Sequence, residues 1–253
     1  MDLRELVKLN RSMGRDMIYN GLCYSETEDR HYITVTSHDE LVSAEIPDGV
    51  DIIGECAFSD QSNMIKCIIP DSIKEISYAA FDNCKSLEFI EIPQSVTSLG
   101  SHIFAGCTSL KYVKILESVN TLSTGIFDGC TSLEEVHLPK SLCRIGSFAF
   151  DACENLGSIH IPANVEQISD YAFRGCSNLQ QIKIPKKVFS IGDRAFAGCK
   201  SLKCISLPNN IVRLGYGVFE DCDNLRRVYI SERWKSAISY VFSNYDAIEW
   251  HFF

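Results

Sequence analysis

Apolar positions recur with a fixed period of 23 residues along most of this chain. One phenylalanine marks each unit: Phe58, Phe81, Phe104, Phe127, Phe150, Phe173, Phe196 and Phe219. A cysteine follows three residues later in all units but the first, which has Gln61: Cys84, Cys107, Cys130, Cys153, Cys176, Cys199 and Cys222. Leucine, or Met64 in the first unit, stands six residues after each phenylalanine. A period of this size predicts a solenoid whose units bury their apolar sides against their neighbours.

The segment Leu87–Ile92 shows what each unit contributes to the solenoid. Apolar and outward positions alternate over its last four residues, which is typical of a short strand with Ile90 and Ile92 inward and Phe89 and Glu91 outward. Each unit is therefore expected to add one strand to a parallel sheet. The coil should be right-handed, because crossovers between parallel strands are.

The rest of the unit predicts a turn and a second apolar corner. Pro93 ends the strand because proline has no amide hydrogen for the ladder. Val96 and Leu99 form a second inward pair, and Gly100 is expected to permit a tight corner before the next phenylalanine.

The two ends depart from the repeat, which divides the chain into residues 1–40, a solenoid over 41–230, and residues 231–253. Near the N-terminus, Leu3, Leu6 and Val7 indicate a short amphipathic helix, while Gly21 and the polar run Ser25–Arg30 indicate a loop. A degenerate repeat unit begins at Tyr32, with Val35 lying 23 residues before Phe58.

After Ile230 the apolar residues take helical spacing over Glu232–Asn244: Trp234, Ala237, Ile238, Val241 and Phe242. The last residues, Ala247–Phe253, are strongly aromatic. A helix with an apolar face at the open end of a solenoid predicts a cap that covers an edge prone to aggregation. A helix that docks a partner is the alternative.

Charge and hydropathy narrow the function. The formal net charge of −9 argues against a nucleic-acid partner, because a general nucleic-acid binder carries a basic stripe. No apolar run approaches the roughly 20 residues of a membrane span. The start lacks the apolar stretch of a secretory signal, which favours the cytoplasm; a secreted or cell-surface location is the alternative if a leader was removed.

Seven of the twelve cysteines share one register of the repeat, which is a packing pattern. Stacked at the strand spacing of about 4.8 Å, their side chains would run parallel, so buried free thiols are favoured over disulfides. Structural zinc is less favoured, because the sequence has no CxxC pair, in which two residues separate the cysteines, and no histidine at matching register.

The repeat resembles the BspA-like class of leucine-rich repeats, whose units read IPxxVxxIGxxAFxxCxxLxxI. One unit follows that pattern almost throughout: Ile161, Pro162, Val165, Ile168, Ala172, Phe173, Cys176, Leu179 and Ile182. The resemblance extends from about Leu41 to Ile230. It implies a curved leucine-rich-repeat solenoid with the parallel strands on its concave side, mostly strand and loop. Members of the class are often surface proteins that attach to host or bacterial proteins, and the family carries no catalytic motif.

No phosphate loop, dinucleotide fingerprint, zinc-protease motif or serine-hydrolase elbow is present, so a non-catalytic protein without cofactor is expected. Binding is assigned to outward strand positions, since packing does not dictate them. The candidate partner-binding residues are Phe89, Tyr112, Lys114, His137 and His160. A protein partner is expected, with a glycan as the alternative ligand.

Each candidate also has a plainer interpretation. Phe89 and Tyr112 could stack across neighbouring strands and only stabilise the sheet. His137 and His160, expected in register on adjacent strands, could share a metal ion with Glu135, although solvated histidines facing a groove are favoured.

Overall fold

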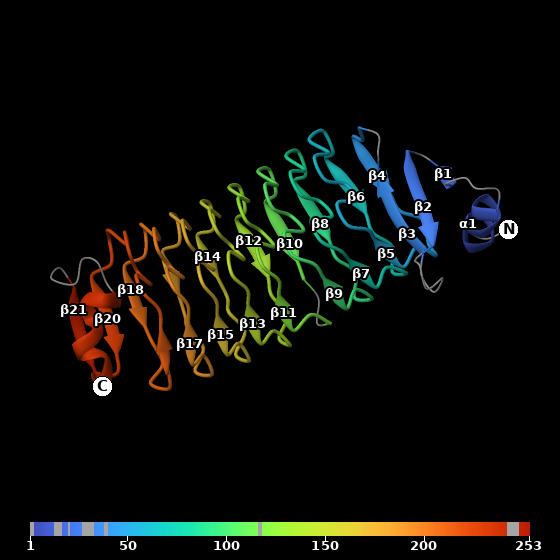
Figure 1. Cartoon of the computed structure of the whole chain (residues 1–253). Helices are drawn as coiled ribbons and strands as arrows, with labels where there is room; N and C mark the ends of the chain where they lie inside the picture. The colour runs from blue at the N-terminus through green and yellow to red at the C-terminus, as the bar shows by residue number, and fades with distance from the viewer. Residues whose placement is uncertain are drawn as a thin grey trace.

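The computed structural model describes residues 3–12, 17–19, 21–26, 33–37, 40–115, 118–241 and 248–253. The chain forms an elongated parallel β-solenoid, with the N-terminus at one end and the C-terminus at the other (Figure 1). Each coil of the solenoid contributes two strands, separated by the turn that follows the proline position. The predicted repeat architecture is therefore confirmed.

The main strand row contains the strands expected from the alternating pattern. They are β4 (Ser43–Glu45), β6 (Lys66–Ile68), β8 (Phe89–Glu91), β10 (Tyr112–Lys114), β12 (Glu135–His137), β14 (Ser158–Ile159), β16 (Gln181–Ile182), β18 (Cys204–Ser206), β20 (Arg227–Ile230) and β21 (Glu249–Phe252). Backbone pairing divides this row into the groups β4–β6, β8–β10–β12, β14–β16 and β18–β20–β21. Within the first three groups, and between β18 and β20, the strands pair in parallel at the repeat register, as Phe89, Tyr112 and Glu135 do. The central residue of each three-residue strand is buried, which confirms the inward and outward assignment.

A second, shorter row of strands was not foreseen. Two-residue strands end at the second residue of the expected inward pair, the position of Leu99: β5 (Ile52–Ile53), β7 (Glu75–Ile76), β9 (Ser98–Leu99), β11 (Thr121–Leu122), β13 (Arg144–Ile145), β15 (Gln167–Ile168), β17 (Ser190–Ile191) and β19 (Arg213–Leu214). These strands also pair in parallel at the repeat register. Strands of two residues show no alternation in the sequence, so their pattern could not be recognised.

The repeated phenylalanines form one continuous stack through the core. All eight are at most 2% exposed, and neighbouring rings stack with centroids 5.1 to 5.7 Å apart. The backbone reinforces this stack, since the amide of Phe127 donates to the carbonyl of Ala149 in the next coil at 3.0 Å. Each of the six rings from Phe81 to Phe196 therefore belongs to two interfaces between coils.

The seven register cysteines are free and buried, as expected. Their thiols form a second ladder, because each S–H donates to the carbonyl of the phenylalanine in the preceding coil; Cys84 Sγ lies 3.1 Å from the oxygen of Phe58, and Cys130 Sγ lies 3.0 Å from that of Phe104. The same contact recurs at Cys107, Cys153, Cys176, Cys199 and Cys222. The cysteine therefore supplies a weak donor to a buried carbonyl, which explains its fixed register.

These thiols should resist alkylation in the folded protein. Burial raises the pKa of the Cys153 and Cys199 thiols well above the ordinary value and that of Cys222 to about 12, so little reactive thiolate forms near neutral pH. Mass spectrometry after a short iodoacetamide pulse should show labelling of the exposed Cys143 but of none of these three. In denaturant all four should react, and rapid native labelling of the three would contradict a packed thiol ladder.

Two left-handed residues in each coil shape the turns around the phenylalanine. Residues two before and two after it have positive φ, for example Phe148 at 57° and Ala152 at 55° in one coil and Gly175 at 73° in the next. Gly100, expected to provide this freedom, has no such angle. A side chain there would meet the backbone of Ser77 at 2.5 Å, so the glycine permits close approach of the neighbouring coil.

Exchanging glycine and alanine at the left-handed positions should change stability in opposite directions. Ala152→Gly should raise the free energy of unfolding by about 0.5–1 kcal/mol, because it relieves a conformation that costs a side chain roughly 1–2 kcal/mol, partly offset by unfolded-chain entropy. Gly175→Ala should lower the free energy of unfolding by a similar amount, because the alanine is forced into the positive φ of this position. No steric clash adds to this cost, since the added Cβ makes only ordinary contacts with Ala152, the nearest at 3.4 Å. Urea unfolding measures both changes.

Gly157→Ala is the control for this pair. Gly157 lacks a positive φ, and an added Cβ would meet no atom within 4 Å. That variant should be neutral or slightly more stable because only the unfolded chain loses freedom. Equal destabilisation by Gly175→Ala and Gly157→Ala would show that backbone conformation is not the cause.

The N-terminal end contains the predicted helix and an unpredicted sheet. Helix α1 covers Leu3–Ser12 and buries Val7. Strands β1 (Met17–Tyr19), β2 (Leu22–Glu26) and β3 (Ile33–Ser37) are antiparallel, so the expected loop from Ser25 was wrong at its first two residues; residues 27–30 lie outside the described part. Val35 pairs with Ile53 and continues the short strand row, so its alignment with Phe58 was also wrong.

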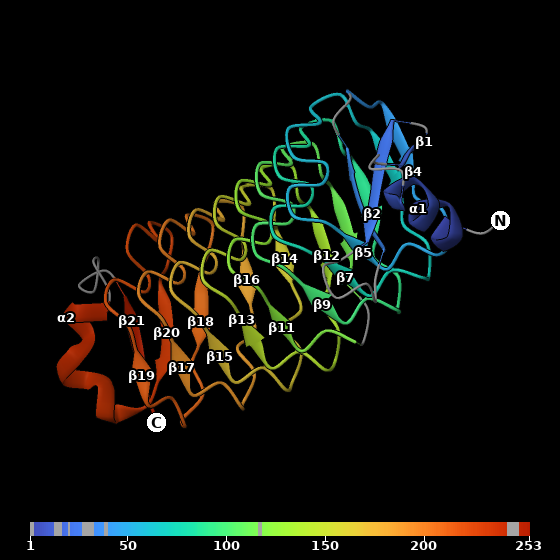
Figure 2. The same ribbon diagram turned by 45° about the vertical axis from the view of Figure 1, so that its right-hand side comes forward.

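The C-terminal cap combines a short helix with one more strand. A 3₁₀-helix η1 (Glu232–Ala237) leads into α2 (Ile238–Val241), at the end of the stack in Figure 2. The helix predicted to continue to Asn244 is described only to Val241, and Phe242 lies outside the described residues. The aromatic tail then forms β21, which pairs in parallel with β20 and extends the main strand row.

Candidate functional site

The outward residues of the main strand row form the candidate recognition surface. We call Phe89, Tyr112, Lys114, His137 and His160 the front patch. Strands β8, β10 and β12 are hydrogen-bonded to one another, so they fix Phe89 beside Tyr112 and Lys114 beside His137. The structure therefore brings four of the five predicted residues together on one paired sheet.

Exposure differs across the front patch. The Phe89 side chain is 49% exposed, although it is large and apolar. Tyr112 is half-buried, and its ring contacts the His137 ring edge-on with centroids 5.6 Å apart. No direct Phe89–Tyr112 ring contact is recorded within the described part of the chain, so stacking with Tyr112 does not account for the exposed Phe89 ring.

The two histidines occupy different surroundings. His137 Nε2 lies 2.7 Å from Glu135 Oε1 on the same strand, and both side chains are exposed. His160 follows β14, which lies next to β12, but no backbone ladder joins these two strands among the residues described, so pairing does not hold the two histidines side by side. That part of the chain also contains no group of three or more His, Cys, Asp or Glu side chains arranged to hold a metal.

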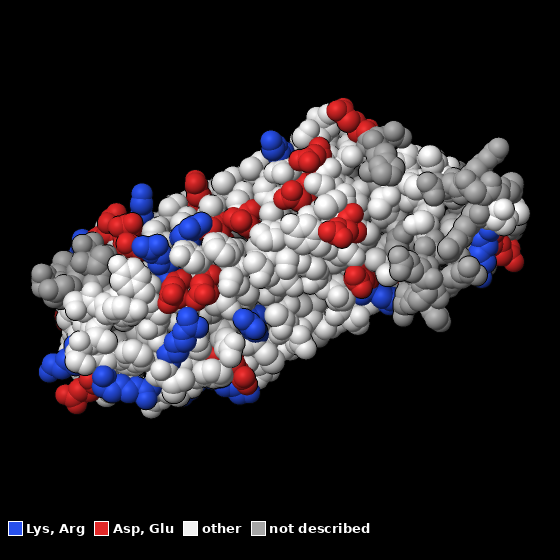
Figure 3. Space-filling view, viewed as in Figure 1, with Lys and Arg blue, Asp and Glu red and all other residues white. Residues whose placement is uncertain are grey.

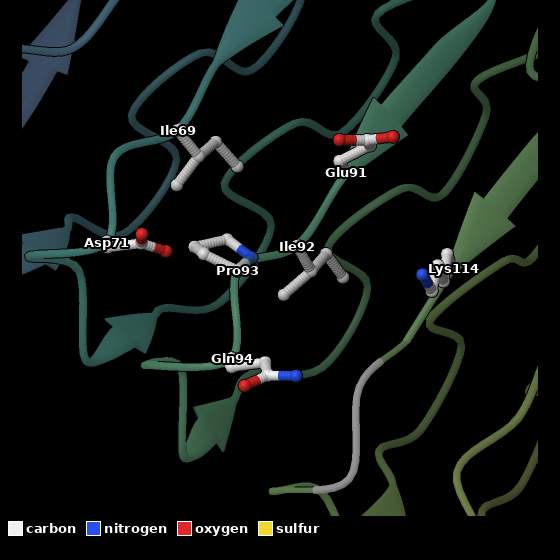
Figure 4. Close-up of a pocket in the computed structure, with 7 residues that line it drawn as sticks. All are labelled: Ile69, Asp71, Glu91, Ile92, Pro93, Gln94 and Lys114. Atoms are coloured by element: carbon white, nitrogen blue, oxygen red, sulfur yellow. The ribbon is translucent and has the colours of Figure 1, made fainter.

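A hollow adjoins the front patch at Lys114, with a cavity volume of about 370 Å³. Figure 4 shows its lining: Ile69, Asp71, Glu91, Ile92, Pro93, Gln94 and Lys114. It lies where β6 and β8 are not hydrogen-bonded within the described coils. The hollow combines two carboxylates, one ammonium and an apolar floor, and sequence reasoning missed it because nothing in the repeat marks where the sheet opens.

A second aromatic group lies on the turn side of the coils and was also missed. The rings of Phe148 and Tyr171 stack at 4.8 Å, and the Arg174 guanidinium lies over both at 5.6 and 5.0 Å. Arg174 also donates through Nε to the buried carboxylate of Asp151 at 2.8 Å. These side chains satisfy one another across two coils, so their arrangement is explained by packing.

The fold and surface together define a leucine-rich-repeat type of solenoid, with packed rows inside and a rigid strand face outside. The sequence matches the BspA type leucine rich repeat region in six copies, over residues 35–157 and 143–252. The chain belongs to this family, and repeat folds of this kind are typically non-catalytic and consistent with protein interaction.

Solved structures of bacterial leucine-rich repeat proteins agree with this assignment. The leucine-rich repeat protein of T. pallidum is 31% identical, with a TM-score of 0.69 over 74% of this chain and 91% of that chain. A leucine-rich repeat protein from Eubacterium ventriosum is 28% identical, with a TM-score of 0.61 over 69% of this chain and 49% of that chain. Comparison with curated proteins gives no match. No helix in the described ranges is long and apolar enough to cross a membrane.

Proposed function

We propose that the chain is a recognition module that binds a protein partner through the front patch of its main strand row. The observation that carries this proposal is the Phe89 ring, held half-exposed on a paired strand beside Tyr112. Aromatic residues are enriched among the side chains that dominate binding energy, because they provide apolar area with little side-chain entropy to lose.

The rigidity of the sheet supports the same function. Backbone pairing of β8, β10 and β12 fixes the spacing of the patch before a partner arrives, which lowers the free-energy cost of association. Lys114, His137 and the neighbouring hollow add polar contacts at the rim of the apolar centre. This arrangement matches protein interfaces, which place an apolar centre inside a polar rim.

Removing both rings should weaken binding without unfolding the protein. The double variant Phe89→Ala with Tyr112→Ala should lose about 2 kcal/mol of binding free energy, or roughly thirtyfold in affinity. The partner is first captured on the immobilised chain, identified and purified, and its affinity is then measured by calorimetry. Thermal unfolding should confirm a folded variant, since neither side chain faces the core.

The matched control is Tyr78→Ala with Tyr216→Ala. Both tyrosines are almost as exposed as Phe89 but lie in the turns that precede the repeated phenylalanines, outside the main strand row. This variant loses the same number of rings and should bind normally. A folded front-patch variant that keeps the parental affinity would place the interface elsewhere.

A further inference from the structure

A separate hollow opens in the main strand row between β16 and β18, with a cavity volume of about 620 Å³. Its lining comes from two successive coils and from Phe253: Gln181, Ile182, Lys183, Ile184, Lys186, Cys204, Ser206, Leu207, Pro208, Asn209 and Phe253. The volume lies within the range of about 300–1,000 Å³ usual for small-ligand sites. None of these residues belongs to the front patch.

The hollow coincides with an interruption of the sheet. Strand β16 pairs with β14, and β18 pairs with β20, but no backbone hydrogen bond joins β16 to β18 within the described coils. The aliphatic side chains Ile182 and Ile184 line this gap while remaining at most 8% exposed. The opening therefore has an apolar floor formed by the core itself.

The charge of this hollow is opposite to that of the whole chain. Lys183 and Lys186 line it, no Asp or Glu does, and neither lysine forms an ion pair with any residue that the structure describes. Just before β8 and β10, by contrast, Lys111 pairs with Glu88 at 3.5 Å. The net charge is −9, yet Lys and Arg are more frequent toward the C-terminal half of the face in Figure 3.

The neighbouring surface extends the same character. A smaller hollow of about 310 Å³ shares Gln181, Ile182 and Lys183 with the first and adds His160, again without a carboxylate. Field lines concentrate where one sign of charge lines a concave surface, which attracts an oppositely charged ligand. The occupant of the larger hollow should therefore be anionic.

The neutral polar side chains of the hollow indicate which other groups the ligand should carry. The side chains of Gln181, Ser206 and Asn209 line the hollow, and none has a protein hydrogen-bond partner in the part of the chain described. The Phe253 ring, 57% exposed, stands at the edge. Amide and hydroxyl groups match the hydroxyls of a sugar, and the aromatic ring and aliphatic floor match its apolar ring face.

We propose that this hollow binds an acidic sugar residue of a glycan, with Lys183 and Lys186 contacting its carboxylate. Gln181, Ser206 and Asn209 hydrogen-bond its hydroxyls, and Phe253 covers one face of its ring. An extended acidic peptide fits less well, because it presents few hydroxyl groups for these three side chains. The larger hollow shares no residue with the front patch, while the smaller hollow beside it includes His160 of that patch.

Calorimetry against paired oligosaccharides tests this assignment on the intact chain. Short hexuronic acid oligosaccharides and a sialylated trisaccharide are each compared with their neutral counterparts, alongside a glutamate-rich peptide. At least one acidic oligosaccharide should bind tenfold or more tightly than its neutral counterpart, since a hydrogen bond to a charged group contributes more than a neutral one. Its affinity should fall when salt is raised from about 0.05 to about 0.5 M.

Matched lysine variants locate the binding. Lys183→Gln with Lys186→Gln should weaken binding of that oligosaccharide about tenfold or more, and Phe253→Ala should weaken it further. Lys140→Gln is the control, because Lys140 is exposed, occupies the repeat position of Lys186 two coils earlier and lies outside the hollow. The proposal is overturned if no acidic oligosaccharide exceeds its neutral counterpart, if the double variant binds normally, or if only the peptide binds.

Discussion

Phe127→Ala should lower the free energy of unfolding by about 3–5 kcal/mol, the usual cost of removing a buried phenylalanine ring. The ring is fully buried and stacks on Phe104 at 5.7 Å and on Phe150 at 5.4 Å. Its loss leaves a cavity between three coils whose positions are fixed by backbone hydrogen bonds on either side, so the site cannot collapse freely. Guanidinium unfolding followed by circular dichroism measures the change.

The comparison variant is Phe89→Ala, which removes the same atoms from an exposed strand position. It should change stability by no more than about 0.5–1 kcal/mol, as for a surface substitution within a sheet. A large loss for Phe127→Ala with little loss for Phe89→Ala places the stabilising contribution in the buried stack. Similar values for the two variants would contradict a shared phenylalanine core.

Regular positions of the repeat made most of the fold predictable from sequence. Burial of Phe127, Cys130 and Leu133 followed from recurrence, because only a packed core imposes the same residue at the same place in every coil. The outward assignment of Phe89 followed from strand alternation. Repetition thus reported both which residues are inside and how neighbouring coils align.

Features that depend on the backbone left weaker signals. The left-handed positions hold residues as different as Phe148, Ala152 and Gly175, because hydrogen bonds between coils impose the conformation whatever the side chain. Enrichment of glycine two residues after phenylalanine, at Gly106, Gly129, Gly175 and Gly198, was the available sign. The thiol-to-carbonyl ladder was hidden because it joins residues 26 apart, which requires a view of the neighbouring coil.

The candidate site was predictable only in part. Which side chains face outward on β8, β10 and β12 followed from the period, and the structure brings those residues together. The openings between β6 and β8 and between β16 and β18 could not be predicted from the period. These strands are not hydrogen-bonded to each other, yet the apolar pattern of the sequence continues through them without a break. Both larger hollows lie at such openings, whereas the smaller one lies across the paired strands β14 and β16.

Deleting Glu232–Phe253 should produce the largest loss of solubility and stability. The deletion removes β21 from the edge of β20 and uncovers Val228 and Ile230, both at most 1% exposed in the intact chain. It also removes the partly buried Trp234, Trp250 and Phe252, which pack against the core. An unpaired strand edge beside exposed apolar side chains pairs readily with other copies, so aggregation is expected.

A shorter deletion separates the two parts of the cap. Removing residues 248–253 takes away β21 alone and keeps η1 and α2, which hold Phe219 through the carbonyl of Val241 at 3.4 Å. The full deletion should lose several kcal/mol, corresponding to a fall in melting temperature of roughly 10 °C at 2–4 °C per kcal/mol, and the shorter one should lose part of that. Light scattering and thermal unfolding report the two effects. If the full deletion stays monomeric with the parental melting temperature, residues 232–253 do not cap the solenoid, and the apolar rows must end stably at β20 without them.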